Sequence, residues 1–214
     1  ACTTGYTAGV TITISLQAVS GDPTVFGTNI WNVYGYNAQS MTPTLANYRG
    51  YYTQNTLGCD TQDTANNGWV NTTSPSSSAG WNGCQVPNDS FTMVHKRKGF
   101  PAGSYQLIVK NYDDTTQIFI NGVQVRNYTT WYGGSASYQD DLGIYCLNAN
   151  STIEVITNEN TSLANFKLNI VASNAIYSGT AWNSGVNPSN KSVEIQSNLS
   201  LTNDLTICSC TVKA

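Results

Sequence analysis

Two adjacent carboxylates, Asp113 and Asp114, are the residues whose type and spacing point most clearly to chemistry. They lie in a short loop between alternating apolar–polar segments at 105–110 and 117–126. Like charges this close repel each other, so a protein that keeps both in one tight loop often supplies a cation. Ca²⁺ takes roughly six to eight oxygen ligands from carboxylates, amides, backbone carbonyls and water. Because Asp is also a common turn residue, an ordinary exposed turn is the alternative.

Two further acidic groups point less clearly to an ion. Asp140 and Asp141 form a second pair, which we interpret as a loop or the exposed start of a strand. Asp60 and Asp63 lie close together in a Cys-Asp-Thr-Gln-Asp segment, but the spacing of an EF-hand loop is absent. Neither group therefore enters the predicted metal site.

Aromatic side chains are candidates for a sugar platform, because the C–H face of a pyranose stacks on a ring. Tyr112 adjoins the acidic pair, and Trp131 lies in a Gly-flanked loop after the 117–126 segment. We predict both as ligand-binding residues. Large aromatic residues more often belong to a core, which we expect of Trp31 and Trp69 and which stays an alternative for Trp131.

Catalysis has little support in the residue pattern. The single histidine, His95, lies in the basic run 95–98 without a serine elbow, so a histidine-dependent triad is not indicated. We interpret this basic run as a solvated strand end rather than an anion site. Glycoside hydrolysis needs two carboxylates about 5–10 Å apart in a cleft, and no motif marks such a pair among the 12 acidic residues. We therefore expect no enzyme.

Six cysteines in a chain of low charge indicate disulfides and an oxidising compartment. We predict a Cys59–Cys84 bond, because both residues lie in one Gly/Asn/Ser-rich insertion without a core of its own. Closing that loop of roughly 25 residues would stabilise the fold by about 3 kcal/mol in the chain-entropy model. Cys208 and Cys210 share one face of a possible strand, but a C-x-C spacing without a nearby histidine matches zinc poorly.

The composition is that of an extracellular β protein. Only 10% of the 214 residues are charged, against about 25% in typical soluble domains, so uncharged polar side chains must cover the surface. The chain has 9 Lys and Arg against 12 Asp and Glu and no basic stripe, which disfavours nucleic acid as a partner. No run of about 18 apolar residues is present, so we expect no membrane span.

Alternation of apolar and polar residues predicts strands and almost no helix. Asn121-Gly122 is the strongest hairpin signal. The segment 37–90 is loop-rich, and loops of that length are usually functional, stapled or interrupted by short strands. The pattern predicts an all-β, antiparallel β-sandwich or jelly roll. The predicted strands lie at 10–19, 31–36, 91–94, 105–110, 117–126, 142–147, 152–157 and 166–172.

The composition changes near Asn174, and a linker-like segment follows at 177–185. We therefore divide the chain into a jelly-roll binding module at 1–174 and a linker with a C-terminal β segment at 175–214. So few residues cannot form a second independent core, so the tail either packs on the first module or begins a following one. Its apolar residues recur in short strand-like runs: Val193, Ile195, Leu199, Leu201, Leu205 and Ile207.

The pattern Gly103-x-Tyr105, then Asp113–Asp114, then Asn121–Gly122 resembles the protective-antigen-type β-sandwich family. That family includes fungal flocculins, GLEYA-like adhesins and sugar-binding modules of bacterial adhesins and glycosidases. The resemblance implies that the acidic pair, often joined by a cis peptide, chelates Ca²⁺ and that the ion binds vicinal sugar hydroxyls. It also implies a third ligand, an asparagine from the loop after a later strand.

The segment 153–158 resembles that later strand and its loop, so Asn158 matches the third ligand and Asn160 is close enough to replace it. Other segments, at 31–36, 48–52 and 96–101, resemble large secreted surface proteins of bacteria that use type IX secretion. The resemblance thus implies a large cell-surface parent protein.

We predict a secreted, lectin-like adhesin module at the cell surface that binds glycans or a cell-surface polysaccharide through Ca²⁺. The alternative is a structural or assembly subunit, or a spacer, of a surface protein or filament, with neighbouring copies or modules meeting through 190–214. The predicted metal ligands are Asp113, Asp114 and Asn158. The predicted ligand-binding residues are Tyr112, Trp131 and Asn160.

Overall fold

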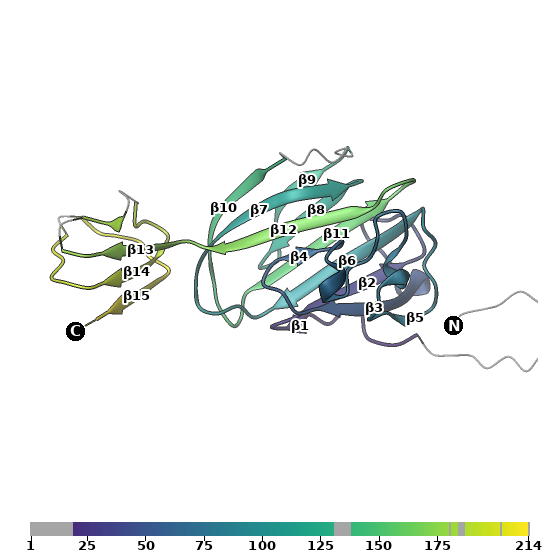
Figure 1. Cartoon of the computed structure of the whole chain (residues 1–214), viewed down its shortest axis with the longest axis horizontal. Helices are drawn as coiled ribbons and strands as arrows, with labels where there is room; N and C mark the ends of the chain where they lie inside the picture. Colours follow the sequence, from purple (N-terminus) through teal and green to yellow (C-terminus); the bar gives the residue numbers. More distant parts are fainter. Residues whose placement is uncertain (1–18, 131–137, 180, 184–186, 202, 214) are drawn as a thin grey trace, which may run out of the picture.

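A computed structural model of the chain describes residues 19–130, 138–179, 181–183, 187–201 and 203–213 (Figure 1). Within these residues the regular structure is strand, apart from three short 3-10 helices at Leu45–Asn47, Thr64–Asn66 and Pro75–Ser77. The all-β prediction is confirmed. No helix in this part of the chain is long and apolar enough to cross a membrane.

The larger sheet of the sandwich has eight strands in the order β5-β3-β2-β6-β11-β8-β9, with β1 paired in parallel to β6. All its other pairings are antiparallel. The strands are β1 (Gly27–Thr28), β2 (Trp31–Tyr36), β3 (Tyr48–Gln54), β5 (Asn82–Gly83), β6 (Phe91–Lys98), β8 (Thr116–Ile120), β9 (Val123–Tyr128) and β11 (Thr152–Glu159).

The second sheet has four antiparallel strands in the order β10-β7-β12-β4. They are β10 (Asp140–Leu147), β7 (Gly103–Asp113), β12 (Asn165–Ala172) and β4 (Cys59–Asp60). The two sheets enclose one apolar core, because each strand alternates inward and outward side chains. Trp31 and Trp69 lie in this core, as predicted.

A third sheet follows at the C-terminal end, drawn to the left of the sandwich in Figure 1. Its strands are β13 (Asn174–Tyr177), β14 (Ser192–Ile195) and β15 (Ser209–Val212), and they pair in parallel. This sheet begins one residue before the predicted boundary between the two modules. The division into modules itself stays a prediction.

The strand predicted at 31–36 coincides with β2, whereas the one predicted at 10–19 lies outside the described residues except for its last. The strand predicted at 91–94 extends through the basic run, so the interpretation of that run as a solvated strand end is wrong. Because β6 lies between β2 and β11, its odd-numbered residues face the core, and His95 and Arg97 are buried there.

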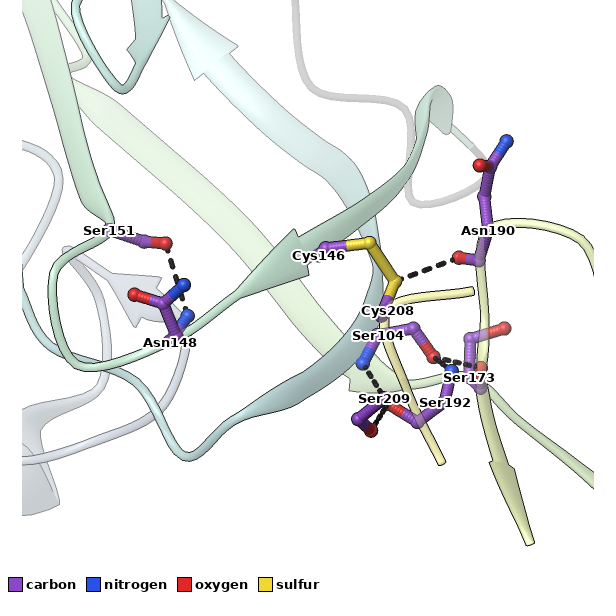
Figure 2. Close-up of a disulfide and its surroundings, with 9 residues drawn as sticks. All are labelled: Ser104, Cys146, Asn148, Ser151, Ser173, Asn190, Ser192, Cys208 and Ser209. Atoms are coloured by element: carbon purple, nitrogen blue, oxygen red, sulfur yellow. Dashed lines mark hydrogen bonds between the residues drawn. A yellow bond between two sulfur atoms is a disulfide. The ribbon is translucent and has the colours of Figure 1, made fainter. Parts of the chain in front are cut away.

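The observed disulfide joins Cys146 of β10 to Cys208, just before β15 (Figure 2). Cys84 is also disulfide-bonded, but Cys59 is free and buried in β4. The predicted Cys59–Cys84 bond is therefore wrong. The physical reason is that Cys59 lies opposite Leu168 of β12, where its side chain packs as a small apolar group in the sandwich core.

Candidate functional site

The acidic pair lies where β7 ends and the chain crosses to β8 in the other sheet. The Asp113–Asp114 peptide bond is cis, as the family resemblance implies. Backbone hydrogen bonds tie this crossing to the end of β11. The Asp114 N–H donates to the Asn158 carbonyl at 2.9 Å, and the Asn158 N–H donates to the Thr115 carbonyl at 2.9 Å. These bonds hold the acidic pair beside the loop that follows β11.

A second contact draws that loop over the pair. The Asn160 N–H donates to Oδ2 of Asp114 at 2.7 Å. Together the two loops border an open depression of about 750 Å³, which we call the acidic depression. Apart from one leucine, its side chains are carboxylates, amides and hydroxyls, and none is basic or aromatic. They are Gln62, Asn71, Asn111, Asp113, Asp114, Asn160, Thr161, Ser162, Leu163 and Asn165.

Burial and like charge act together on the acids of this region. Asp113 is only 8% exposed, and burial followed by the charge of Asp114 raises its pKa to about 7. Glu159, the last residue of β11, is fully buried between the sheets. Burial, followed by the charges of Asp114 and Asp113, raises the pKa of Glu159 to about 8. The metal-free site therefore holds its negative charge poorly at neutral pH.

Several acceptor oxygens near the pair have no donor. Oδ1 of Asn111, Oδ1 of Asn165 and both carboxylate oxygens of Glu159 are buried without a hydrogen-bond partner among the described residues. Asn165 lies directly opposite Asp113 in the β12–β7 ladder, and both asparagines line the acidic depression. Buried acceptors normally find a donor, so this gathering of unpartnered oxygens suits a cation.

Within the described residues, no three His, Cys, Asp or Glu side chains lie close enough together to hold a metal ion. An ion beside Asp113 and Asp114 would therefore need amide, backbone, water or ligand oxygens in addition to the two carboxylates. Hard cations such as Ca²⁺ accept that mixture, whereas Zn²⁺ prefers nitrogen and sulfur ligands. The carboxylate and amide oxygens available here are of the kind that Ca²⁺ binds.

The structure brings Asp113, Asp114 and Asn160 together in the acidic depression. Asn158 contributes its backbone to the site, but its side chain lies elsewhere: its Oδ1 accepts a hydrogen bond from the Thr92 hydroxyl at 2.8 Å. Asn158 is not among the residues that line the depression. Its role as a metal ligand stays a prediction.

Tyr112 does not offer a face to a sugar. Its ring is 6% exposed and stacks on Tyr128 at a centroid distance of 4.1 Å, with Tyr138 edge-on at 5.6 Å. The ligand-binding prediction for Tyr112 is therefore corrected: its neighbours in the ladder turn the ring into the core. Trp131 lies outside the described residues.

The other acidic groups have structural partners. Asp140 accepts hydrogen bonds from Arg126 at 2.8 Å and from the Tyr128 hydroxyl at 2.6 Å, and the Arg126 bond is the main reason that its pKa is lowered. Asp60 forms an ion pair with Lys167 at 2.7 Å. Asp140 thus links β10 to β9 of the other sheet, and Asp60 links β4 to its neighbour β12. Neither residue lines the acidic depression.

His95 is sealed in the core between Trp31 and Phe166. Its burial lowers the pKa of the imidazole to about 3, so the ring is neutral at physiological pH. A substrate in the acidic depression has no access to a fully buried ring. The histidine therefore has a structural role.

Sequence reasoning missed Asn111, Asn165 and Glu159. A signal was present for Glu159, because it continues the alternation of the buried positions in β11. For Asn111 the alternation of Leu107 and Val109 is no guide, because a register shift lies between Val109 and Asn111 in the β7–β12 ladder. Polar residues at inward positions near an acidic pair are candidates for a site. The proximity of Asn165 depends on the β12–β7 register and had no local signal.

Comparison with known proteins gives distant structural likenesses only. No protein-family model matches the chain, and no curated protein sequence does. Among solved structures, the chain is similar to a PA14 sugar-binding domain from an RTX adhesin, with a TM-score of 0.47 and 14% identity over 68% of this chain and 91% of that one. It is also similar to the PA14 domain of the MpAFP antifreeze protein, with a TM-score of 0.46 and 15% identity over 78% of this chain and 91% of that one.

A third similar structure is a GH31 alpha-xylosidase from Xanthomonas citri, with a TM-score of 0.37 and 7% identity over 64% of this chain and 13% of that one. With TM-scores below 0.5 and identities of at most 15%, these likenesses do not show what this chain binds. Membership of the protective-antigen-type family likewise stays a prediction.

Proposed function

We propose that this chain is a Ca²⁺-dependent glycan-binding module of the adhesin type, without catalytic activity. The observation that carries the proposal is the donor-poor oxygen cluster around two adjacent carboxylates at an open depression. Asp113 and Asp114 hold the ion, and its remaining positions are filled by amide oxygens and by the hydroxyls of a bound sugar.

The electrostatics of the site support a cation. Without one, burial and the charge of Asp114 penalise the ionised form of Asp113. A divalent cation reverses both effects, because each carboxylate then gains a close opposite charge. The unpartnered Oδ1 atoms of Asn111 and Asn165 are further candidates for the metal or for an ion-bound water.

The lining of the acidic depression supports a polyhydroxylated ligand. Amides and hydroxyls both donate and accept hydrogen bonds, and each sugar hydroxyl can likewise act as donor and as acceptor. The lining holds no basic side chain, so an anionic ligand would have no positively charged partner there apart from the proposed Ca²⁺. The family resemblance of the acidic-pair segment adds the expectation that Ca²⁺ contacts vicinal hydroxyls.

A location outside the cytoplasm is part of the proposal. The Cys146–Cys208 bond and the disulfide at Cys84 need an oxidising compartment. The low charge and the polar, uncharged surface agree with secretion and a place on a cell surface. Weak binding at one site would be amplified if several copies act on one surface.

The first test is thermal unfolding of the full chain under non-reducing conditions, with calcium or with a chelator. An ion present at about a hundred times its Kd stabilises the native state by about 2.7 kcal/mol, which raises the midpoint measurably. We expect that rise in the native chain and in Asp204→Asn, which changes an exposed acid outside the acidic depression. We expect no rise in the double variant Asp113→Asn/Asp114→Asn.

The second test is a glycan array probed with calcium and with chelator. Binding that requires both calcium and the acidic pair supports the whole proposal. A calcium effect on unfolding without glycan binding would support the calcium site and contradict the glycan-binding part of the proposal. If calcium does not change the unfolding midpoint of the native chain, the proposed calcium site is wrong, and so is calcium-dependent glycan binding.

A further inference from the structure

A second depression, of about 370 Å³, lies on the loop-rich segment between β4 and β6, and we call it the indole depression. It is lined by the indole of Trp81, four serine and threonine hydroxyls, two side-chain amides and Gly83, with no charged side chain among them. It shares no lining residue with the acidic depression, so the two are separate hollows. Its volume falls in the range of roughly 300–1,000 Å³ that is typical of small-molecule sites.

The indole of Trp81 is held in place by the backbone beneath it. Gly35 of β2 lies opposite Gly50 of β3, and Gly50 lies opposite Gly83 of β5. A Cβ at Gly35 would lie 2.7 Å from the six-membered ring of Trp81, and one at Gly50 would lie 3.0 Å from it. Because a side chain at either position would displace the ring, these two glycines form a seat for the indole. The Trp81 side-chain N–H donates to the Cys84 carbonyl at 3.1 Å, which sets the orientation of the ring in that seat.

Trp81 differs in its burial from the two tryptophans of the core. Trp31 and Trp69 are 0% and 2% exposed, whereas Trp81 packs against the core but is only partly buried and lines the indole depression. Its packing therefore leaves part of the ring accessible from the depression. An aromatic ring that the protein holds on one side offers its remaining surface to a flat, apolar part of a ligand.

The hydroxyl-bearing side of the indole depression is rigid, because its side chains are bonded to one another and to the backbone. Oγ of Ser76 accepts from the Val86 N–H at 3.0 Å and donates to the Val86 carbonyl at 3.1 Å. The Ser74 hydroxyl donates to the same carbonyl at 2.7 Å. The hydroxyl oxygens of Thr73 and Ser77 are hydrogen-bonded to each other at 2.6 Å. These bonds join the two chain segments that border the depression, so this wall is preformed.

Two side-chain amides complete the lining of the indole depression. Gln85 and Asn88 are exposed, and the side chain of neither is hydrogen-bonded to any residue that the structure describes. A carboxamide carries an NH₂ group that donates and an oxygen that accepts. Both side chains are therefore available to a ligand that brings donors and acceptors of its own.

We propose that the indole depression is a second glycan-binding site, which takes a neutral saccharide without a metal ion. The C–H face of a pyranose lies on the accessible part of the Trp81 ring. The hydroxyls of the sugar bond to the amides of Gln85 and Asn88 and to the hydroxyl-bearing wall. This site goes beyond the proposed function, because it does not use the acidic pair or calcium.

The lining of the indole depression favours a neutral sugar over other ligands. An ionic ligand has no partner of opposite charge there, and a hard cation has no carboxylate to hold it. Proline-rich peptides bind grooves lined with aromatic side chains, whereas Trp81 is the single aromatic residue among those that line this depression. One ring surrounded by hydroxyls and amides suits a ligand with one apolar face and many hydroxyls.

The test measures binding of the full chain, in the presence of a chelator, to an array of neutral gluco-, galacto-, manno- and xylo-oligosaccharides. The chelator removes the proposed calcium-dependent binding, so the two sites are measured separately. The main variant is Gln85→Ala/Asn88→Ala, which changes exposed side chains only. Its matched control is Gln124→Ala/Asn127→Ala, the same exchange of two exposed amides on β9, at the other end of the larger sheet from β5.

We expect the native chain and the control to bind at least one of these oligosaccharides in chelator. Gln85→Ala/Asn88→Ala weakens that binding by about tenfold or more, because hydrogen bonds from two amides are lost. Trp81→Phe keeps an aromatic ring and retains more binding than Trp81→Leu, which does not. Where the Trp81 variants do not fold, the amide variant decides by itself.

Two results would overturn this second site. The first is an absence of binding to the array by the native chain in chelator, which leaves the calcium-dependent site to its own test. The second is binding in chelator that Gln85→Ala/Asn88→Ala leaves unchanged, because the sugar then lies elsewhere on the chain.

Discussion

At the residue scale, the site is governed by acids that the fold has placed where ionisation is costly. Among the residues that the structure describes, none donates a hydrogen bond to either carboxylate oxygen of Glu159, and Asp113 faces the charge of Asp114. In water each of these carboxyls would be ionised at pH 7. In the folded chain their pKa values are raised, so either a bound proton or a nearby cation can compensate the buried negative charge. Protons and the cation therefore compete for these carboxylates.

The first prediction concerns the pH dependence of stability in the presence of a chelator. The folded-state pKa values of Asp113 and Glu159, about 7 and about 8, lie above their ordinary values, so the folded chain binds protons more tightly than the unfolded chain. Stability is therefore greatest at mildly acidic pH and falls as the pH rises from 5 to 8, by on the order of 1 kcal/mol per pH unit. Chemical denaturation at several pH values measures it.

Glu159→Gln is the matched variant, because glutamine keeps the shape and cannot ionise. We expect a shallower pH slope and a more stable chain at pH 8. An unchanged slope would show that Glu159 is ionised without penalty in the native state.

The second prediction separates the two asparagines. Asn160 is among the residues that line the acidic depression, whereas the side chain of Asn158 is hydrogen-bonded to Thr92. We expect Asn160→Ala to weaken calcium binding by roughly tenfold, the loss of one oxygen ligand, and Asn158→Ala to affect mainly stability, by about 1 kcal/mol. Calorimetric titration with calcium and thermal unfolding distinguish them; the reverse pattern would restore Asn158 as the ligand.

At the element scale, the site depends on strand ends that are joined across the two sheets. The chain leaves β7, crosses at the acidic pair and enters β8, while the end of β11 is hydrogen-bonded to that crossing. The β8–β9 hairpin turns at Asn121 and Gly122, which both have positive φ angles, of 50° and 78°. That turn keeps β8 in register with β11, because Asn121 also accepts from the Thr152 N–H at 2.9 Å.

The third prediction tests that hairpin. A Cβ added at Gly122 would meet nothing within 4 Å, so Gly122→Ala acts through the backbone alone. We expect a loss of about 1 kcal/mol in the free energy of unfolding, because a non-glycine residue resists φ near +78°. Gly122→Asn is the control and recovers part of the loss, since asparagine tolerates this region. Equal stability of all three chains would contradict the turn geometry.

At the scale of the whole molecule, the chain joins a sandwich of mostly antiparallel strands to the third sheet, whose strands are parallel. The junction uses the Ser104–Ser192 hydrogen bonds and the disulfide between β10 and the chain before β15. The residues that line the acidic depression all belong to the sandwich, and none belongs to the third sheet.

The fourth prediction concerns the disulfide, which encloses a sequence separation of 62 residues. In the chain-entropy model a loop of that size contributes about 4 kcal/mol. We expect Cys146→Ser/Cys208→Ser to leave calcium binding intact and to loosen the third sheet from the sandwich, seen as faster hydrogen exchange in β14 and β15. Cys210→Ser is the control, because Cys210 is free. Unchanged exchange in the double variant would show that the serine hydrogen bonds alone hold the junction.

Much of the fold could be predicted from the sequence, because a strand's alternation is a local property. The segment 31–36 became β2 without change, and Asn121–Gly122 turned the hairpin as predicted. The acidic pair was equally visible, since its two members are neighbours in the chain. By itself the sequence determined the class of fold, several of the central strands and the presence of two adjacent carboxylates between two of them.

The tertiary structure alone decided which distant residues meet. The β12–β7 register places Asn165 opposite Asp113. Cys208 is bonded to Cys146, a pairing that the spacing of the cysteines along the chain does not indicate. Two residues of the basic run, His95 and Arg97, are buried because β6 lies between two other strands. The tail's apolar residues became a parallel stack only when chain offsets of 18 and 17 brought its strands side by side. Each of these outcomes depends on long-range packing, whose energy is a sum over residues far apart in the chain and leaves no local pattern to read.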